Sequence, residues 1–482
     1  MSFSRVVKES PALSSFSPNG KHLAVPCAAK VTIYNSITFQ EIATISNVDV
    51  VDAIEWSPDS KLLLCLLLKP KIVQVWHPED TTWKCRISEG SLGLISACWS
   101  PDSQHILTTA DFQIRTTVWS LVEKSVLYLK QAKLPLSLRS FSQSGEHLAV
   151  VERRDSKDFV SIINCKTWTL EQNFPVASED IADLLWAPNA ETFCIWESPR
   201  TGFQLYVYST AGAKLASFGL NEEIIGIKSL SWSHCGQVVL LESFDDKIML
   251  LETVAWGKLL DYELPEVLTD NSMAIPTSSL QIIYKEVKTK QTIKRGPRPI
   301  ESYYEVVPIR PVSPGYLIRV GDGSDALSQQ TAVKLSASQN YLARISATFP
   351  NIVFILDIRK LILTAVLVHL TPVTCIAWDH QSDKLAICTY AKHLCLWTPS
   401  NAITLEVPCK AELYSTVAAL IVGCHGVKGG TSIASHGRHN WQCVCAHVVL
   451  LARPSLTNNG ILVIPPEQEK QGSASPRSAR AT

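Results

Sequence analysis

The fold is decided by residues 97–120, which read ACWSPDSQHILTTADFQIRTTVWS. An apolar run ends at Trp99, and Ser100-Pro101-Asp102-Ser103 follows as a tight turn, because proline presets the second turn position and serine and aspartate bond the local backbone. Two further stretches, His105–Thr109 and Arg115–Trp119, are rich in β-branched and aromatic residues and are separated by a short turn. The stretch therefore predicts three strands of a small antiparallel sheet.

The same turn recurs along the chain at a regular spacing. An aromatic or apolar residue precedes each copy, and six of the seven steps between consecutive copies are 40 to 46 residues long, as is the step of 43 residues from Trp56 to Trp99. Each copy is followed by an alternating strand that ends in large apolar residues, such as Val73–Trp76 or Leu394–Trp397. The residues that precede the turns are Phe16, Trp56, Trp99, Phe141, Trp186, Trp232, Leu335 and Trp378.

A period of about 40 to 45 residues with four strands in each unit is typical of a WD-type β-propeller. One four-stranded sheet leaves both of its faces exposed, and stacking such sheets around an axis gives each face a neighbour. We therefore predict an all-β, WD40-type propeller of four-stranded blades, with eight recognisable units and a degenerate C-terminal one. Residues 3–7 precede the first turn without a blade of their own, so they are predicted to complete the last sheet.

The match to the WD pattern is incomplete. No unit carries the Gly-His pair that usually opens a blade, and only Leu356-Asp357 keeps the aspartate of the Trp-Asp dipeptide. The polar network of Asp, His, Ser and Trp side chains found in such blades is therefore predicted to be mostly absent. Blade stability is expected to depend instead on the tryptophans that precede the turns, because each can bury a large area. These are Trp56, Trp99, Trp186, Trp232 and Trp378.

The repeat divides the chain into four parts. Residues 3–262 hold blades one to six, residues 332–455 hold the remaining blades, and residues 456–482 are predicted to be a disordered tail. Residues 263–331 interrupt the period, because the step from Trp232 to Leu335 is 103 residues long. This proline-rich segment is either an insertion or a degraded blade, and we favour a partly ordered insertion.

Composition limits the classes of function. Lys plus Arg equal Asp plus Glu at 44 each, so the overall charge gives no argument for binding to nucleic acid or to a membrane surface. The longest apolar runs are shorter than the roughly 18 to 20 residues of a membrane helix. The 14 cysteines are scattered, which favours free thiols in a reducing, intracellular compartment. No phosphate-binding loop, nucleophile elbow or His-Glu-x-x-His motif is present, so we predict neither an enzyme nor a cofactor.

A charged loop is the strongest candidate for binding a partner. Six charges fall within seven residues between the second and third strands of the fourth unit, at Glu152, Arg153, Arg154, Asp155, Lys157 and Asp158. In a propeller, this connection lies on the same rim as the loops between blades, a surface commonly used for binding. The alternative is a soluble turn that only keeps an edge polar.

A basic cluster lies in the proline-rich segment. It comprises Lys285, Lys288, Lys290, Lys294, Arg295 and Arg298. Such a cluster suits an acidic partner, for example a tubulin tail or a nucleic acid. We favour a solvated linker, because no aromatic residues that could stack on single-stranded nucleic acid are interleaved with the charges. We therefore predict no nucleic-acid partner.

The C-terminal region concentrates residue types that bind zinc. They are Cys424, His425, His436, His439, Cys443, Cys445 and His447. No Cys-x-x-Cys pair is present among them, and this spacing argues against a zinc site. We therefore predict no metal.

Several short stretches give a more specific resemblance than the repeat period does. Residues 152–162 read ERRDSKDFVSI, and they resemble the WD-repeat protein eight family, the centrosomal and spindle-pole WD proteins. The other stretches that carry this resemblance are EGSLGL at 89–94, CWSPD at 98–102, GIKS at 226–229 with Trp232, YKE at 284–286 and LAICT at 385–389. The resemblance runs from about residue 3 to residue 407.

This resemblance implies a non-enzymatic scaffold of the cytoplasm and cytoskeleton, at centrosomes, centriolar satellites or spindle poles. Members of the family act with a coiled-coil anchoring protein of the synovial-sarcoma-X-breakpoint-interacting type, tether microtubule minus ends, and support spindle and cilium assembly. The gamma-tubulin complex and a minus-end-directed kinesin are further partners that it implies. The expected mode is capture of the coiled coil by one propeller rim. An adaptor of a ubiquitin ligase or of a vesicle coat would use the same fold and is the alternative.

Overall fold

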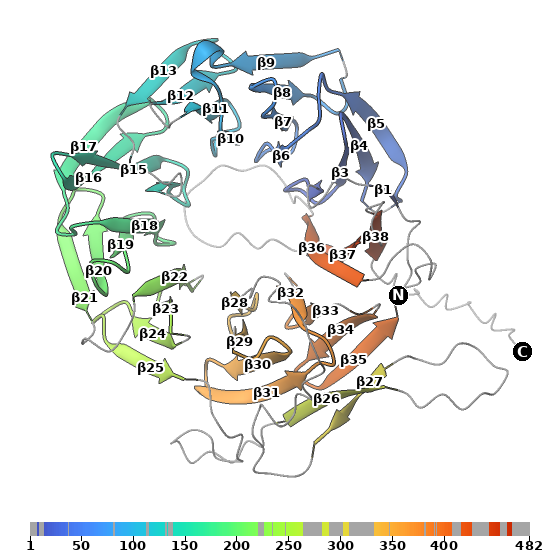
Figure 1. Ribbon diagram of the computed structural model, residues 1–482. Coiled ribbons are helices and arrows are strands. Elements are labelled where there is room, and N and C mark those ends of the chain that lie inside the picture. Colours follow the sequence, from blue (N-terminus) through green and yellow to red (C-terminus); the bar gives the residue numbers. More distant parts are fainter. Residues whose placement is uncertain are drawn as a thin grey trace, which may run out of the picture.

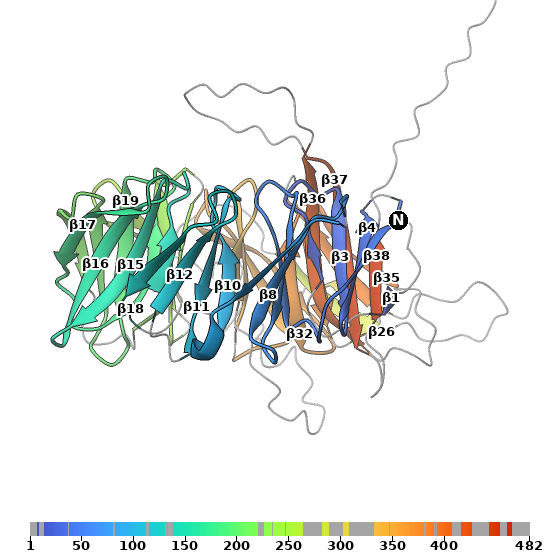
Figure 2. The ribbon, with the colours of Figure 1, turned by 90° about the horizontal axis from the view of Figure 1, so that it is seen from above.

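The computed structural model is a ring of β-sheets around a central axis (Figure 1). Seen from above, the ring is flattened, and its strands run roughly along the axis (Figure 2). The structure describes residues 7–8, 14–36, 38–80, 82–111, 115–130, 133, 138–219, 226–233, 235–245, 247–263, 282–288, 302–307, 332–346, 348–379, 382–389, 391, 393–406, 416–426, 443–453 and 460–464, with the backbone alone from residue 416 onward. Over these residues it has eight four-stranded sheets and one six-stranded sheet, which confirms the predicted all-β propeller of eight units and a C-terminal one.

The first three blades are regular. Blade one has β2 (Ser15–Phe16), β3 (His22–Cys27), β4 (Lys30–Asn35) and β5 (Glu41–Ser46). Blade two has β6 (Ala53–Trp56), β7 (Leu63–Leu67), β8 (Ile72–Trp76) and β9 (Lys84–Ser88). A short 3-10 helix, η1 (Gly90–Leu92), leads to blade three, with β10 (Ser96–Trp99), β11 (His105–Thr109), β12 (Arg115–Ser120) and β13 (Val126–Lys130).

Blades four to six follow the same order. Blade four has β14 (Arg139–Phe141), β15 (His147–Arg154), β16 (Lys157–Asn164) and β17 (Thr169–Pro175). Blade five has β18 (Ile181–Trp186), β19 (Thr192–Glu197), β20 (Gln204–Ser209) and β21 (Lys214–Gly219). Blade six has β22 (Ile227–Trp232), β23 (Val238–Ser243), β24 (Ile248–Glu252) and β25 (Lys258–Tyr262).

The last three blades contain the irregular parts. Blade seven has β28 (Ala332–Leu335), β29 (Tyr341–Ile345), β30 (Ile352–Asp357) and β31 (Ile362–Val368), extended by β26 (Ile282–Lys288) and β27 (Ser302–Val306). Blade eight has β32 (Val373–Trp378), β33 (Leu385–Thr389), β34 (His393–Thr398) and β35 (Asn401–Glu406). Blade nine has β36 (Thr416–Gly426), β37 (Cys443–Arg453), β38 (Gly460–Ile464) and β1 (Val7–Lys8).

The core lies between neighbouring sheets, and tryptophans join them. Buried apolar side chains of adjacent blades form shared clusters, as Ile33 of β4 and Leu63 of β7 do. Four of the tryptophans that precede the turns also donate their indole N–H to a backbone carbonyl of the innermost strand of the preceding blade. The pairs are Trp56 with Ser15 at 3.1 Å, Trp99 with Glu55 at 3.2 Å, Trp186 with Ser140 at 2.8 Å and Trp378 with Lys334 at 2.9 Å. A repeated hydrogen bond therefore adds to the expected apolar packing.

The turns of the first three blades are also linked to one another. The backbone N–H of Asn19 donates to Oγ of Ser60 at 3.0 Å, and that of Asp59 donates to Oγ of Ser103 at 2.9 Å. Ser60 and Ser103 both have positive φ, 65° and 61°. Glycine would fit this backbone with less strain. The serine hydroxyl explains the choice, because it accepts a hydrogen bond from the blade before it.

Two blades keep a polar contact of the WD type, built from other residues. In blade three, Trp119 Nε1 donates to Thr108 Oγ1 at 2.7 Å, and Thr108 donates to the buried carboxylate of Glu89. In blade two, Trp76 Nε1 donates to Asn47 Oδ1 at 2.9 Å. In these two blades, glutamate and asparagine accept hydrogen bonds in place of the residues of the WD network.

The two ends of the described chain meet in blade nine. Val7 of β1 lies opposite Ile461 of β38 in antiparallel pairing, which confirms for Val7 that the N-terminal segment completes the last sheet. β38 also corrects the predicted tail of residues 456–482. Residues 460–464 read GILVI, an apolar and β-branched run that forms a strand and ends before Pro465.

The proline-rich segment contributes a hairpin, β26–β27, on the outside of the ring (Figure 1). β26 pairs in parallel with β31, from Ile282 opposite Ala365 to Lys285 opposite Val368, and β27 pairs antiparallel with β26. Of the two alternatives for residues 263–331, the described part is thus a hairpin added to blade seven rather than a blade of its own.

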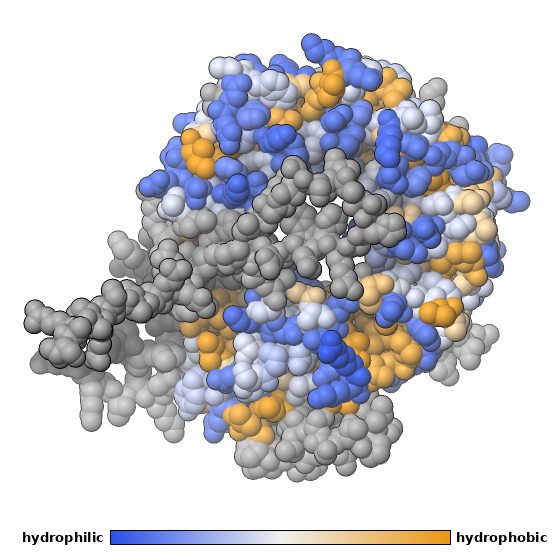
Figure 3. Space-filling view, turned by 180° about the vertical axis from the view of Figure 1, so that it is seen from behind, coloured by the Kyte–Doolittle hydropathy of each residue, from blue (hydrophilic) through white to orange (hydrophobic). Residues whose placement is uncertain are grey.

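The surface opposite the one in Figure 1 has hydrophilic and hydrophobic residues intermixed around the ring (Figure 3). Within the described ranges, we find no helix with the length and apolar composition needed to cross a membrane.

Candidate functional site

The charged loop is the tip of a long hairpin on one rim of the propeller. β15 and β16 have eight residues each and are joined by Asp155 and Ser156, whose φ angles are 49° and 64°. Two residues at positive φ form the tight turn that fits the twist of the flanking strands. Because successive strands of a blade reverse direction, this turn shares its rim with the loops that join blades. We call this side the interblade rim.

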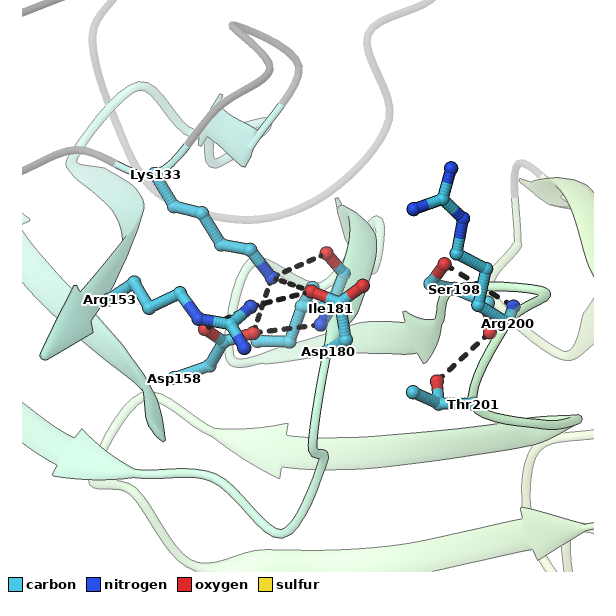
Figure 4. A network of polar contacts seen from close by, with 8 residues as sticks. All are labelled: Lys133, Arg153, Asp158, Asp180, Ile181, Ser198, Arg200 and Thr201. Carbon is cyan, nitrogen blue, oxygen red and sulfur yellow. Dashed lines mark hydrogen bonds and ion pairs between the residues drawn. The ribbon is translucent and has the colours of Figure 1, made fainter. Parts of the chain in front are cut away.

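Two charges of the loop belong to a partly buried ion network (Figure 4). The fully buried carboxylate of Asp158 lies 2.5 Å from Lys133 Nζ and accepts the backbone N–H of Ile181 at 2.8 Å. Lys133 Nζ also lies 2.7 Å from the carboxylate of Asp180 and donates to the Ile181 carbonyl at 3.0 Å. The Arg153 guanidinium lies 2.7 Å from Asp180 and 3.6 Å from Asp158. Asp158 and Arg153 therefore fix the hairpin to the loop that begins blade five.

The charges in this network are balanced. Burial alone would raise the pKa of Asp180, but the hydrogen bonds and charges of Lys133 and Arg153 lower that pKa below its ordinary value. Two cations thus face two carboxylates, Asp158 and Asp180, and buried charges are tolerated when they are paired in this way. The network stabilises one position of the hairpin relative to blade five.

Two more charges of the loop form a second group. Ser161 Oγ donates to Glu152 Oε1 at 2.8 Å, and Asn173 Nδ2 donates to Ser161 Oγ at 2.7 Å. Arg154 pairs with the other oxygen of Glu152, and its guanidinium lies 5.6 Å from the centre of the Phe159 ring. This cation–π contact and the ion pair hold Arg154 along the hairpin.

The remaining charges of the loop are exposed. Asp155 and Lys157 lie at the tip of the hairpin. Arg200 is also exposed on the interblade rim, in the loop between β19 and β20, where Thr201 donates to the carbonyl of Ser198 at 3.0 Å (Figure 4). Sequence reasoning missed Arg200, Lys133 and Asp180, because none of them lies within the run of charges. Binding by the six predicted residues stays a prediction.

The basic cluster is described only in part. Lys285 and Lys288 lie on β26, where Lys285 is half-buried and Lys288 is exposed. Lys285 lies opposite Glu305 in the antiparallel register of β26 with β27. The other four residues lie outside the described part of the chain, namely Lys290, Lys294, Arg295 and Arg298.

Metal ligation is not indicated by the described side chains, among which no group of three His, Cys, Asp or Glu could hold an ion. The cysteine- and histidine-rich residues 424–447, from which a zinc site was considered, lie outside the side chains that the structure describes.

Comparison with known proteins gives a clear relative. The chain is 35% identical over 421 residues to the WD repeat-containing protein WRAP73 of Mus musculus, a match that covers 85% of this chain and 89% of that protein. It is 21% identical over 319 residues to an uncharacterised WD repeat-containing protein of Schizosaccharomyces pombe, covering 65% and 61% of the two chains. No family model matches the chain.

Among solved structures, the C-terminal WD40 domain of Sif2 matches 84% of this chain and 99% of that chain, with 13% identity and a TM-score of 0.47. The match to WRAP73 is close enough, and long enough in both chains, to decide the family. The chain belongs to the WD-repeat protein eight family, the family of WRAP73.

Proposed function

We propose that this WD-repeat propeller, a protein-interaction scaffold, acts without catalysis at the centrosome or spindle pole. In this proposal it binds a coiled-coil anchoring protein of the synovial-sarcoma-X-breakpoint-interacting type. The complex helps to tether microtubule minus ends and supports spindle and cilium assembly, with the gamma-tubulin complex or a minus-end-directed kinesin as further partners.

The observation that carries the proposal is the hairpin β15–β16 on the interblade rim. The ion network around Asp158 fixes it close to its tip, while Asp155 and Lys157 at the tip are exposed. A charged loop held in one position loses little conformational freedom when a partner binds. The neighbouring Arg200 extends the charged surface to blade five, so that an extended helical partner would contact both blades.

The first experiment measures the affinity of the purified full chain for the purified coiled-coil anchoring protein. Lys157→Glu and Arg200→Glu reverse two exposed charges and leave the buried network intact. Reversal of Arg153 is less informative, because that residue also holds the fold. We expect each reversal to weaken binding by about tenfold at low salt, and less at high salt, because exposed charges act mainly on association.

The matched control is Lys21→Glu, which reverses an exposed lysine on the opposite rim, in the turn between β2 and β3. It should bind as the wild type does. If all three variants bind equally, the interblade rim around blade four is not the contact. If the wild type itself does not bind the anchoring protein, the proposed partner is wrong.

The second experiment locates the protein. The tagged chain is imaged in dividing cells, and its complexes are identified by affinity purification and mass spectrometry. Spindle-pole localisation with pole proteins supports the proposal. Recovery of ubiquitin-ligase or vesicle-coat subunits instead would support the adaptor alternative.

A further inference from the structure

A buried cluster of ionisable side chains joins the inserted hairpin to blades seven and eight. The carboxylate of Glu286 on β26 lies 2.5 Å from Nε2 of His393, the first residue of β34. It lies 3.8 Å from Nδ1 of His369, which follows β31, and it accepts the backbone N–H of Leu370 at 3.0 Å. The side chains of Glu286 and His369 are fully buried, and that of His393 is nearly so.

The second strand of the hairpin contacts the same two histidines. The hydroxyl of Tyr304 on β27 lies 3.2 Å from His369 Nδ1, and that of Ser302 lies 3.3 Å from His393 Nε2. His369 and His393 therefore each contact one side chain from each strand of the hairpin. The carbonyl of Ser302 also accepts a hydrogen bond from Thr404 of β35 at 2.5 Å, so the hairpin is tied to both blades.

The cluster can hold one proton on its imidazoles without net charge. The titratable groups that face it are Glu286 from β26, Tyr304 from β27, His369 after β31, and His393 and Cys395 from β34. Burial raises the pKa of both Tyr304 and Cys395, so these groups are neutral. One carboxylate balances one imidazolium. Protonation of the second imidazole would leave a net positive charge in a site without water access, which is unfavourable.

We propose that this cluster is an acid-sensitive latch, and that protonation of His369 releases the hairpin β26–β27 from blades seven and eight. The groups that bury His369 on its outer side, Glu286 and Tyr304, leave with the hairpin. His369 then becomes accessible to water, and β31 becomes the outer edge of its blade, as β25 and β35 are in theirs.

The direction of the pH effect follows from His369. Burial lowers its pKa to about 4, against the opposing effect of the Glu286 carboxylate, whereas the ordinary value is 6.5. The released state therefore binds the proton more tightly, so docking is strongest above pH 6.5 and weakens as the pH falls towards 4. Between pH 7.5 and 5.5, the docking equilibrium should weaken about tenfold.

Glu286 acts in the same direction at lower pH. Burial would raise its pKa, but the hydrogen bond and charge of His393 lower it to about 2. Its contribution to docking is therefore present above its ordinary pKa of 4.5 and is lost below it. The change in docking between pH 7.5 and 5.5 is therefore due to His369.

The test is hydrogen exchange of the full chain at pH 7.5 and 5.5, with rates corrected for the intrinsic effect of pH. Protection of peptides from β26 and β31 should fall about tenfold at pH 5.5. Protection of β7 (Leu63–Leu67) in blade two should not change, and it serves as the internal reference. Equal protection of β26 at both pH values would overturn the proposal.

Three variants separate the latch from general acid sensitivity. His369→Gln replaces the imidazole by a neutral group that forms hydrogen bonds but does not ionise. The hairpin β26–β27 of this variant should therefore stay protected from exchange at both pH values. Glu286→Gln should lose about tenfold protection of β26 already at pH 7.5, because a hydrogen bond to a charged group is lost. Tyr303→Phe, on the exposed face of β27, is the matched control and should behave as the wild type. A full acid response in His369→Gln would also overturn the proposal.

Discussion

Replacement of Asp158 by asparagine tests whether the charged hairpin is held by its own buried ions. The change removes the charge that Lys133 Nζ meets at 2.5 Å in the interior of the rim. Removing one partner of a buried ion pair typically costs about 3–5 kcal/mol. Lys133 keeps Asp180 at 2.7 Å and the Ile181 carbonyl at 3.0 Å, so the cost here should be smaller. We expect the free energy of unfolding to fall by about 2–3 kcal/mol.

The measurement is urea denaturation of the full chain, followed by tryptophan fluorescence. The matched control is Asp155→Asn, the same chemical change at the exposed tip of the same hairpin, which should stay within about 0.5 kcal/mol of the wild type. The double variant Asp158→Asn with Lys133→Met should lose less than the two single variants together, because no buried cation is left facing a neutral amide. Equal midpoints for Asp158→Asn and Asp155→Asn would refute the reasoning.

Three further changes test the contacts between blades. Trp186→Phe removes the indole donor to the Ser140 carbonyl and should lower the unfolding free energy by at least about 1 kcal/mol in a urea titration; no loss would mean that this bond contributes nothing. Ser103→Gly removes the hydroxyl that accepts the Asp59 N–H but relieves the strain of a backbone at φ 61°. The unfolding free energy in the same titration should therefore change by less than about 1 kcal/mol. Ser103→Val removes the hydroxyl and keeps the strain, so it should lower the unfolding free energy by more. Burial raises the pKa of Glu55 in the folded protein from 4.5 to about 7. The stability that protonation of Glu55 gives the folded state is therefore present below pH 4.5 and is lost as the pH rises through 7. The melting temperature of Glu55→Gln relative to the wild type should therefore rise between pH 5 and pH 8, and a constant difference would contradict this.

The architecture could be predicted from the sequence because its signals are local. A turn of the type Ser100–Ser103, with an aromatic or apolar residue before it, marks blades one to eight, and the spacing of these turns predicts the repeat. The hydrogen bonds of the tryptophans were not predicted, because their acceptors are backbone carbonyls about 41 to 46 residues earlier, which have no side-chain signature. The contact of Trp119, Thr108 and Glu89 was not predicted, because a glutamate stands where the WD pattern has other residue types.

The candidate site could be predicted only as a run of charges. The run places Arg153 and Asp158 opposite each other across the hairpin, which the two-residue turn makes predictable. Their ion-pair partners, Lys133 and Asp180, come from loops on either side of blade four, and nothing in their local sequence marks them. The parallel register of β26 with β31 is similarly long-range, since Ile282 pairs with a residue more than 80 positions later.

Two hairpins of this propeller depart from the repeat, and a buried carboxylate lies at each of them. A regular blade is covered on each face by a similar blade, and the two share a cluster of buried apolar side chains. The long hairpin of blade four and the added hairpin of blade seven have no such repeated neighbour. Each is instead fixed by paired ions, at Asp158 and at Glu286. Buried ion pairs contribute little net stability compared with apolar contacts but are specific in geometry. These ions therefore serve to fix the position of the two hairpins. We expect any difference in partner binding from other propellers to arise at these two hairpins.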